Sequence, residues 1–330
     1  MNLKNKRIVF MGTPEFSVPS LEILVSKGYN VVGVYTQVDK PSKNLKVVDC
    51  PVKVCATKHD IPVFQFLKLR QEDGVQSLRD LKPDIVITAA FGQLLTQTIL
   101  DIPTIGVYNV HASLLPKYRG GCPIHWCIID GNIETGITIM RTEKGLDTGP
   151  ILLQIPCEIG NDDTYDEVYT RLSKLGAVAL DEFLNKFDTF VEIPQDDSSS
   201  SYQPIIQKSD GKINWNNSSQ QVHNHIRGVT SSPGAYCTHG DAILKIHKTK
   251  LIDASDKRLN NLKSNELFSS NENILAGTVV CADRKNGLVV ACNQGFVEIL
   301  ELQAPNKKRL SSKDFLNGNS LKVNDILGEF

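Results

Sequence analysis

The chain has 330 residues, of which 41% are hydrophobic and 22% are charged, and its formal net charge is −1. This composition is typical of a globular protein with room for two domains, and no apolar run approaches the roughly 20 residues that a membrane span requires. Residues 1–7 lead directly into a short apolar segment without a signal-peptide core, and the eight cysteines are scattered along the chain. We therefore expect a soluble cytoplasmic protein with reduced thiols and no contact with a membrane.

Short apolar segments alternate with helical patterns through the first part of the chain. Predicted strands cover residues 7–11, 31–36, 84–88 and 106–110, and predicted helices cover residues 16–27, 51–58 and 71–81. This alternation predicts a doubly wound, Rossmann-like α/β domain with a mainly parallel sheet. Ligands bind such sheets at the carboxyl ends of the strands, which is where Asn109 and His111 fall.

Glycines surround an aspartate further along the chain. Predicted strands at residues 135–140 and 150–155 flank the loop Gly145–Gly149, which carries Asp147 at its tip. A helix is expected over residues 119–130, and a longer one over residues 163–186 begins with an acidic first turn, as the helix dipole favours.

The composition changes near residue 195. The serine-rich run 195–201 has the character of a linker, so we predict a catalytic domain at residues 1–192, a linker at 193–206 and a second domain at 207–330. Short predicted strands at 242–246, 277–280, 287–291 and 296–300 favour a smaller, OB-like β-barrel, with residues 253–273 as a surface insertion. Residues 1–204 carry 20 basic and 25 acidic side chains, whereas residues 205–330 carry 16 and 12, so the second domain is mildly basic.

Several familiar chemistries lack their motifs in this chain. There is no three-glycine dinucleotide fingerprint, no phosphate-binding loop with Lys and Ser/Thr, and no Gly-x-Ser-x-Gly nucleophile elbow. His111, Cys122, His125 and Cys127 lie close in sequence, but they lack paired Cys-x-x-Cys spacing, and a helix would place the two cysteines on different faces. We expect no metal.

Asn109, His111 and Asp147 together offer an amide, an imidazole and a carboxylate. Asn109 and His111 are two residues apart at the end of one strand, so both project to one side of the sheet, and Asp147 can reach them from its loop. Such donors can stabilise a tetrahedral oxyanion while the carboxylate tunes the imidazole and accepts a proton. This set predicts acyl-type transfer without a metal or a covalent nucleophile.

The segments that carry these residues resemble a known family. Residues 109–120, 134–140 and 145–150, with Met11–Phe16, residues 212–215, 233–235 and 314–318, are similar to the formyltetrahydrofolate-dependent formyltransferases, in particular to those that act on methionyl-tRNA. The resemblance spans the whole chain. It implies transfer of the formyl group of 10-formyltetrahydrofolate to the α-amino group of methionine on initiator tRNA, by a monomeric enzyme of translation initiation.

The resemblance also implies roles for individual residues. Asn109 and His111 would steady the oxyanion, and Asp147 would act with His111 in proton transfer. Phe16 would lie near the aminoacyl end of the tRNA. The folate site would be formed by Ser113, Leu114, Leu115, Pro116, Phe91, Gly92 and Arg141.

A basic segment would meet the tRNA. Lys40, Lys43 and Lys46 lie where the family carries a basic loop that enters the acceptor end, and lysines there would pair with phosphates. The chain departs from the family pattern here, because the usual arginine is replaced by lysines, and also at Gly121–His125. The alternatives are a formyltransferase for a sugar-nucleotide amine, a folate hydrolase with the same trio, or a catalytically idle RNA-binding protein. The basic segment and the mildly basic second domain favour tRNA.

Overall fold

The computed structural model describes residues 3–41, 47–253, 255–259, 274–318 and 321–328. The chain divides into two compact units. The N-terminal unit comprises Met1–Pro123, Glu134–Glu158 and Val168–Ile205, and the C-terminal unit comprises Ile124–Ile133, Ile159–Glu167 and Ile206–Phe330. The domain limits expected from the sequence remain a prediction.

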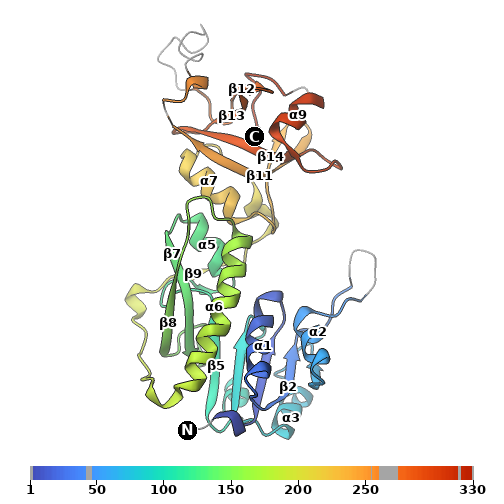
Figure 1. Ribbon diagram of the computed structural model, residues 1–330, viewed down its shortest axis with the longest axis vertical. Helices are drawn as coiled ribbons and strands as arrows, with labels where there is room; N and C mark the ends of the chain where they lie inside the picture. Colours follow the sequence, from blue (N-terminus) through green and yellow to red (C-terminus); the bar gives the residue numbers. More distant parts are fainter. Residues whose placement is uncertain (1–2, 42–46, 254, 260–273, 319–320, 329–330) are drawn as a thin grey trace. The chain divides into compact units, whose positions relative to one another are not determined.

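A seven-stranded sheet forms the centre of the N-terminal unit (Figure 1). Its order is β3-β2-β1-β4-β5-β7-β8; the pairs among the first five strands are parallel, and β7 and β8 are antiparallel. The strands are β1 (Ile8–Gly12), β2 (Val31–Thr36), β3 (Val63–Gln65), β4 (Ile85–Ala89), β5 (Gly106–His111), β7 (Glu134–Arg141) and β8 (Ile151–Glu158). The predicted Rossmann-like, mainly parallel sheet is confirmed.

Helices cover both faces of this sheet. They are α1 (Val18–Ser26), α2 (Pro51–Lys58), α3 (Glu72–Asp80), α4 (Gln97–Leu100) and α6 (Tyr165–Asn185), with short 3-10 turns η1 (Leu3–Asn5), η2 (Glu15–Ser17), η3 (Phe187–Thr189) and η4 (Asp197–Ser199). Val9 and Val107 pack in one core cluster with Leu78 of α3 and Ile99 of α4. The continuous apolar strands follow from this arrangement, because both faces of a doubly wound sheet are buried.

The packing of the long helix α6 on β5 shows which way the side chains of β5 point. Tyr108 of β5 packs against Phe183 of α6 with ring centroids 4.9 Å apart, and a side chain at Gly176 would meet Val110 at 3.0 Å. Alternate residues of a strand face opposite sides. Asn109 and His111 therefore point away from α6, toward the same side as Val107.

One predicted helix begins later than expected. Residues Arg119–Gly120 form a short strand β6 that pairs with β9 (Tyr202–Gln203), and helix α5 (Pro123–Ile129) starts only afterwards. Gly120 has a φ of 109°, and a Cβ there would lie 2.7 Å from the Gln203 carbonyl oxygen. Only glycine fits such a conformation and such a close approach, so the helical pattern of residues 119–130 is interrupted.

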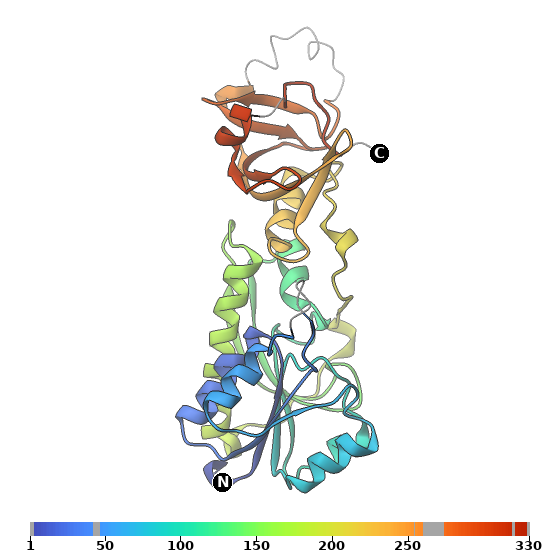
Figure 2. The same cartoon turned by 90° about the vertical axis from the view of Figure 1, so that its right-hand side faces the viewer.

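The C-terminal unit contains an antiparallel sheet, visible from two directions in Figures 1 and 2. Its order is β10-β11-β14-β13-β12, and β15 pairs with β14. The elements are η5 (Lys208–Gly211), α7 (Ser219–Gly228), β10 (Ala235–His239), β11 (Ala242–Ile252), η6 (Lys257–Leu259), β12 (Val279–Asp283), β13 (Gly287–Ala291), β14 (Phe296–Gln303), β15 (Leu310–Ser311) and α9 (Ser312–Gly318). The expected second domain of short strands is thus confirmed as an antiparallel sheet.

The C-terminal unit has its own core, in which α7 packs on the sheet. Trp215, Val222 and Ile226 are buried with Leu244 and Leu288. Helix α7 begins at a capping box, in which Ser218 and Gln221 satisfy each other's backbone N–H groups. Most of the surface insertion expected at residues 253–273 lies outside the described residues, which here include only 253 and 255–259.

Burial lowers the pKa of four histidines in the C-terminal unit, among them His247, where a hydrogen bond with the Gln303 side chain offsets part of the effect. The others are His125, His223 and His225, and in each of these a hydrogen bond with a backbone carbonyl oxygen offsets part of the effect. The carbonyl partners belong to Ser232, Asn161 and Asp210.

None of the helices in the described parts of the chain has the length and apolar character of a membrane span.

Candidate active site

The carboxyl ends of β1 and β4 meet at the point where the strand order reverses. The Gln37 side-chain amide donates to the Phe91 carbonyl oxygen at 3.0 Å, and the Thr13 hydroxyl lies 3.4 Å from the same oxygen. Chain connections leave β1 in one direction and β4 in the other, and open α/β sheets bind ligands at such a switch point. Two of the residues predicted for chemistry, Asn109 and His111, lie at the carboxyl end of β5, the next strand of the sheet.

The amide of Asn109 is oriented by a neighbouring strand. The Thr88 hydroxyl lies 2.8 Å from Asn109 Oδ1 and 3.4 Å from the Tyr108 carbonyl oxygen, so the shorter contact is the true hydrogen bond. Because the hydroxyl donates to Oδ1, the NH₂ end of the amide is left as the donor. It makes no hydrogen bond with any residue that the structure describes, and it remains available to an oxygen of a substrate.

His111 is held by one ring nitrogen and offers the other. Its side chain is 6% exposed, and Nε2 lies 3.0 Å from the Tyr118 carbonyl oxygen. A carbonyl only accepts, so Nε2 carries a proton, and Nδ1 is the nitrogen that gains or loses one. Nδ1 lies 3.7 Å from Asp147 Oδ2, which is too long for a direct hydrogen bond but close enough for the carboxylate to stabilise a charged ring.

Asp147 lies on a strained turn whose geometry is fixed. Its φ is 52°, in the left-handed region, and its side chain is 15% exposed. The Gly120 N–H donates to Asp147 Oδ2 at 2.8 Å, so the oxygen that faces His111 also accepts a backbone hydrogen bond. Strained backbone of this kind persists where the surroundings hold it in place, which is common in active sites.

The Asp147 loop is held by residues that sequence reasoning missed. The Gln195 side-chain amide donates to the Asp147 carbonyl oxygen at 2.8 Å and to the Gly149 carbonyl oxygen at 2.7 Å. Gln195 Oε1 accepts from Arg119 Nε and Nη2 at 3.0 and 2.9 Å. Gln195 lies in the segment predicted to be a linker, and of this pair only Arg119 belongs to the motifs that carry the resemblance.

Arg119 is the buried centre of this network, with 1% of its surface exposed. Its guanidinium also donates to Asp197 Oδ1 at 2.8 Å and to the Tyr202 hydroxyl at 2.9 Å. Burial alone lowers the pKa of Arg119, but the bonds to Asp197 and Tyr202 outweigh it and the net pKa is raised. The permanently charged arginine therefore fastens residues 195–202 beside the Asp147 loop.

The loop after β5, predicted to contact folate, is tied down by the two antiparallel strands. The Thr138 hydroxyl donates to the Ser113 carbonyl oxygen at 2.6 Å, and the Gln154 amide donates to the Leu115 carbonyl oxygen at 2.8 Å. Ser113 is fully buried, with its hydroxyl donating to the Lys117 carbonyl oxygen, and Leu115 is 3% exposed. These hydrogen bonds hold the loop in one conformation beside the trio.

The remaining predicted folate residues divide between two places. Phe91 is 5% exposed in the core, while Gly92, with a φ of 79°, lies exposed beside Gln37 at the switch point. Leu114 packs over Gly136, and Pro116 is half-buried after it.

Arg141 lies apart from the other predicted folate residues. It pairs in register with Tyr108, which places it on the α6 face, and there its Nη1 lies 2.7 Å from Glu192 Oε1. The structure thus does not bring the Arg141 side chain to the trio.

The aminoacyl-end candidate Phe16 is 5% exposed and buried against α6. Its ring meets Tyr169 edge-on with centroids 5.5 Å apart, and its carbonyl oxygen accepts from the Ser173 hydroxyl at 2.8 Å. Any role at the aminoacyl end would therefore be exerted through the apolar wall that it forms with Tyr169.

The two ends of the basic segment are held close together. Lys40 is exposed, while Lys43 and Lys46 lie outside the described residues. Asp39 accepts from the Cys50 N–H at 3.0 Å and from Lys53 at 2.5 Å, and residues 41 and 47 form a β-bridge. The two ends of the segment are therefore held together, and Lys53 is used in holding them.

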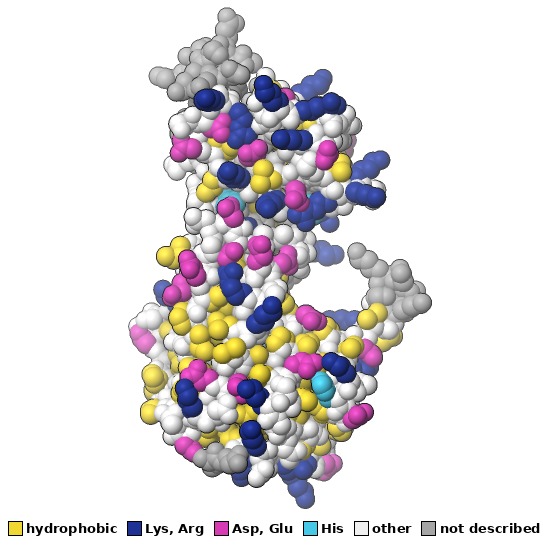
Figure 3. All heavy atoms as spheres, viewed as in Figure 1, with side chains coloured by type: hydrophobic (Ala, Val, Ile, Leu, Met, Phe, Trp, Pro, Cys, Tyr) yellow, Lys and Arg dark blue, Asp and Glu magenta, His cyan; other side chains and the backbone are white. Residues whose placement is uncertain are grey.

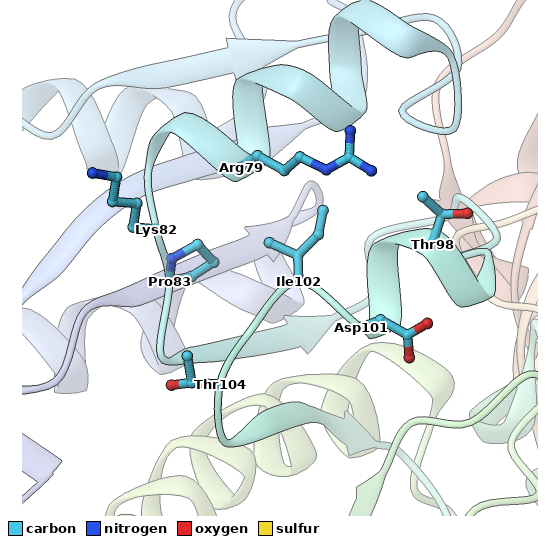
Figure 4. Close-up of a pocket in the computed structure, with 7 residues that line it drawn as sticks. All are labelled: Arg79, Lys82, Pro83, Thr98, Asp101, Ile102 and Thr104. Carbon is cyan, nitrogen blue, oxygen red and sulfur yellow. The ribbon is translucent and has the colours of Figure 1, made fainter.

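A surface cavity of about 600 Å³ lies elsewhere (Figure 4). It is lined by residues between Arg79 and Thr104, including Lys82 and Pro83, which precede β4. It therefore lies at the amino ends of the strands, opposite to the edge that carries the trio, and none of its lining residues belongs to the predicted site.

The sequence predicts no metal at His111, Cys122, His125 and Cys127. Among the described residues, His111 and His125 do not gather with Cys122 or Cys127 into a set of metal ligands. The expectation that this part of the chain binds no metal stays a prediction.

The geometry supports transfer of an acyl-type group between two bound molecules. The Asn109 amide and a protonated His111 Nδ1 are two donors for a developing oxyanion, and Asp147 is the adjacent proton acceptor. Removal of one such donor typically costs about 3 to 4 kcal/mol of transition-state stabilisation.

Comparisons with known proteins identify the family. Residues 6–184 match the formyl transferase family, and residues 205–320 match the formyl transferase C-terminal domain. The chain is 43% identical over 326 residues to the methionyl-tRNA formyltransferase of Ruminiclostridium cellulolyticum, covering 98% of this chain and 100% of that protein. It is 41% identical to the enzyme of the same name from Geobacter metallireducens, covering 97% and 98%.

Solved structures share the fold at lower identity. WlaRD, a sugar 3N-formyl transferase solved in the presence of dTDP and 5-N-formyl-THF, has a TM-score of 0.64 at 21% identity over 92% of this chain and 99% of that one. An N-formyltransferase from Helicobacter canadensis, in complex with folinic acid and dTDP-3-aminofucose, has a TM-score of 0.64 at 20% identity over 89% and 98%.

Proposed function

Because this chain belongs to the formyl transferase family, we propose that it transfers the formyl group of 10-formyltetrahydrofolate to the α-amino group of methionyl initiator tRNA. Relatives at 41 to 43% identity over nearly the whole chain carry the name methionyl-tRNA formyltransferase. The observation that carries the proposal is the oriented set of Asn109, His111 and Asp147 at the carboxyl edge of the sheet.

The proposed reaction is a direct transfer. The methionyl amine attacks the formyl carbon, a C–N bond forms, and the carbonyl oxygen becomes an oxyanion that accepts from the Asn109 amide and from His111 Nδ1. The amine then loses a proton to the Asp147 carboxylate, which lies beside the charged His111 ring. Collapse of the intermediate breaks the bond to N10 of the folate, which leaves with the proton and gives tetrahydrofolate and formylmethionyl-tRNA.

The folate would enter at the switch point of the sheet. Gly92 is exposed there beside Gln37, and the loop Ser113–Pro116 is held in one conformation by Thr138 and Gln154. A rigid edge of this kind suits a planar pterin, which needs hydrogen-bond partners along one side rather than charges.

The tRNA would be held by basic side chains. Lys40, Lys43 and Lys46 belong to the segment whose ends are closed by Asp39. Lys245, Lys248 and other lysines and arginines are exposed on the C-terminal unit, interspersed with acids (Figure 3). Phosphate contacts of this type are independent of sequence and sensitive to salt. We also propose that the enzyme acts as a monomer in the cytoplasm, where its tRNA substrate is charged.

A competition between acceptors tests the proposal. Purified chain is given labelled 10-formyltetrahydrofolate with methionyl initiator tRNA, methionyl elongator tRNA or a sugar-nucleotide amine. We expect label on initiator tRNA, with much lower kcat/KM for the elongator and none on the sugar. Label on the sugar alone would support the sugar-amine alternative, free formate would support a hydrolase, and binding of tRNA without transfer would indicate an idle RNA-binding protein.

A further inference from the structure

Three potential metal ligands meet between α1 and α2 in the N-terminal unit. Glu22 comes from α1, Cys55 from α2, and His59 follows directly after α2. Cys55 and His59 are four residues apart, a spacing that puts two side chains on the same face of a helix. Helices α1 and α2 pack against each other, which brings Glu22 to that face.

The distances fit coordination of one ion. Cys55 Sγ lies 3.4 Å from Glu22 Oε1, and His59 Nε2 lies 3.1 Å from Glu22 Oε2. One ligand atom from each of the three residues falls within 4.8 Å of the others. Zinc bonds to sulfur, nitrogen and oxygen are about 2.0 to 2.3 Å long, so the ligand atoms of a tetrahedral site lie about 3.3 to 3.8 Å apart. Small side-chain rotations therefore suffice to place an ion among them.

We propose that Glu22, Cys55 and His59 form a zinc-binding site that fastens α1 to α2. A thiolate, an imidazole and a carboxylate are the donors that zinc accepts in proteins, and this combination does not suit magnesium or calcium. Three protein ligands leave a fourth position for water. The site uses none of the residues assigned to formyl transfer, for which no metal is expected.

An ion can enter the site from solvent, and its binding requires Lys58 to move and the Cys55 thiol to lose its proton. Cys55 is 5% exposed, whereas the Glu22 and His59 side chains are 39% and 26% exposed, so the site opens to solvent on their side. Lys58 Nζ lies 3.8 Å from Glu22 Oε1, and it must move away when a cation binds; its side chain is 70% exposed and can do so. Burial, and then the charge of Glu22, raise the pKa of the Cys55 thiol to about 12, so coordination releases the thiol proton to solvent.

The site lies on the helix that directly follows the basic segment, so a bound ion would affect how that segment is anchored. Helix α2 begins at Pro51, directly after the basic segment whose base is closed by Asp39. An ion shared between α1 and α2 would stabilise the anchor of that segment. Ligands that bind only the folded chain raise its stability by mass action, so zinc is expected to raise the melting temperature.

The test uses the full chain, stripped with a chelator and titrated with Zn²⁺ or Co²⁺ alone. We expect one equivalent bound, a cobalt spectrum with tetrahedral intensity and thiolate charge transfer, and a higher melting temperature. Cys55→Ser and His59→Gln should each weaken Zn²⁺ binding by about 100-fold or more, whereas Cys50→Ser should leave it unchanged and Lys58→Ala should preserve or tighten it. Equal binding by Cys55→Ser, or no saturable binding by the wild type, would overturn the proposal.

A second measurement uses the wild-type chain, so it tests the site even if the variants fail to fold. Zn²⁺ should protect Cys55 of the wild-type chain, and not Cys50, from alkylation under conditions that open the α1–α2 contact, as read by mass spectrometry. Alkylation of Cys55 at the same rate with and without Zn²⁺ would contradict the site. Formyl transfer is not the readout, so failure of this proposal and failure of the proposed function are distinguishable.

Discussion

Replacing Gln195 by alanine tests whether the Arg119 network positions the Asp147 loop. Gln195 is outside the trio, and its amide donates to the carbonyl oxygens of Asp147 and Gly149 while its Oε1 accepts from Arg119. Gln195→Ala removes all of these contacts. Arg119 keeps its bonds to Asp197 and Tyr202, so the buried charge is not left without a partner.

The expected magnitude follows from the bonds that are lost. Two neutral hydrogen bonds hold the Asp147 loop, each worth about 1 kcal/mol, and the bonds from the charged guanidinium are worth about 1.5 to 3 kcal/mol. We expect the free energy of unfolding to fall by about 3.5 to 5 kcal/mol, the sum of these contributions. If the two tethers of the loop also hold Asp147 in its reactive position, their loss of about 2 kcal/mol lowers kcat by about 30-fold.

The assay is single-turnover formyl transfer at saturating folate and tRNA, with KM values measured separately. Gln195→Ala should lower kcat with little change in either KM, because Asp147 acts after both substrates are bound. Gln195→Glu keeps an acceptor for Arg119 but loses both donors to the loop, so it should show the kcat defect with a smaller loss of stability. Gln97→Ala removes one exposed side-chain bond on α4 and serves as the matched control.

A kcat within about twofold of the wild type for Gln195→Ala would refute the positioning role. The loop would then be held by its own backbone and by the Gly120 N–H alone. A defect confined to the melting temperature, with normal kcat at a temperature where the variant is folded, would have the same meaning.

Three further predictions concern other parts of the molecule. Thr88→Val removes the hydroxyl that orients the Asn109 amide, so kcat should fall about tenfold with the folate KM unchanged, and an unaffected kcat would show that the amide needs no such partner. Lys43→Ala with Lys46→Ala should raise the KM for tRNA and reduce the slope of log KM against log salt by about 1 per lost phosphate contact, while an unchanged tRNA KM would exclude these lysines from the interface. Burial lowers the folded-state pKa of His125, His223 and His225 below their ordinary 6.5, so the unfolded chain binds more protons below that pH. Their stabilising effect is complete above about pH 6.5 and is lost progressively as the pH falls from there toward the folded-state pKa, so the melting temperature of the C-terminal unit should drop between about pH 7 and pH 5. His225→Gln should flatten that drop, and an equal drop in this variant would exclude His225 as a cause.

The strands and the main helices of the N-terminal unit were predictable because burial on both faces leaves continuous apolar runs. The pattern of residues 106–110 placed Asn109 and His111 at the end of a strand, and the packing of Tyr108 on Phe183 shows them on the face away from α6. Glycine around Asp147 marked a turn, and its φ of 52° agrees with such a loop.

The network around Asp147 was not predictable from local sequence. Gln195 and Arg119 are 76 residues apart, and the polar run at 195–201 has the composition of a linker, so nothing local showed that Asp197 and Gln195 bind a buried arginine. The helical pattern after Arg119 failed for a similar reason, because the close approach of Gln203 to Gly120 is a long-range contact. The folate role of Arg141 rests on resemblance alone, and the pairing of β5 with β7 was needed to place its side chain beside Glu192.

One rate comparison tests whether the chain formylates methionyl initiator tRNA with Asp147 as the proton acceptor. The quantity is the single-turnover rate of labelled formyl transfer from 10-formyltetrahydrofolate, measured for the wild type and for Asp147→Asn, which preserves the shape of the side chain and removes its charge. We predict formylmethionyl-tRNA with the wild type and a rate lower by at least about 100-fold with Asp147→Asn, while both substrates still bind. Transfer at the wild-type rate by Asp147→Asn, or no transfer to the tRNA by the wild type, would contradict this mechanism.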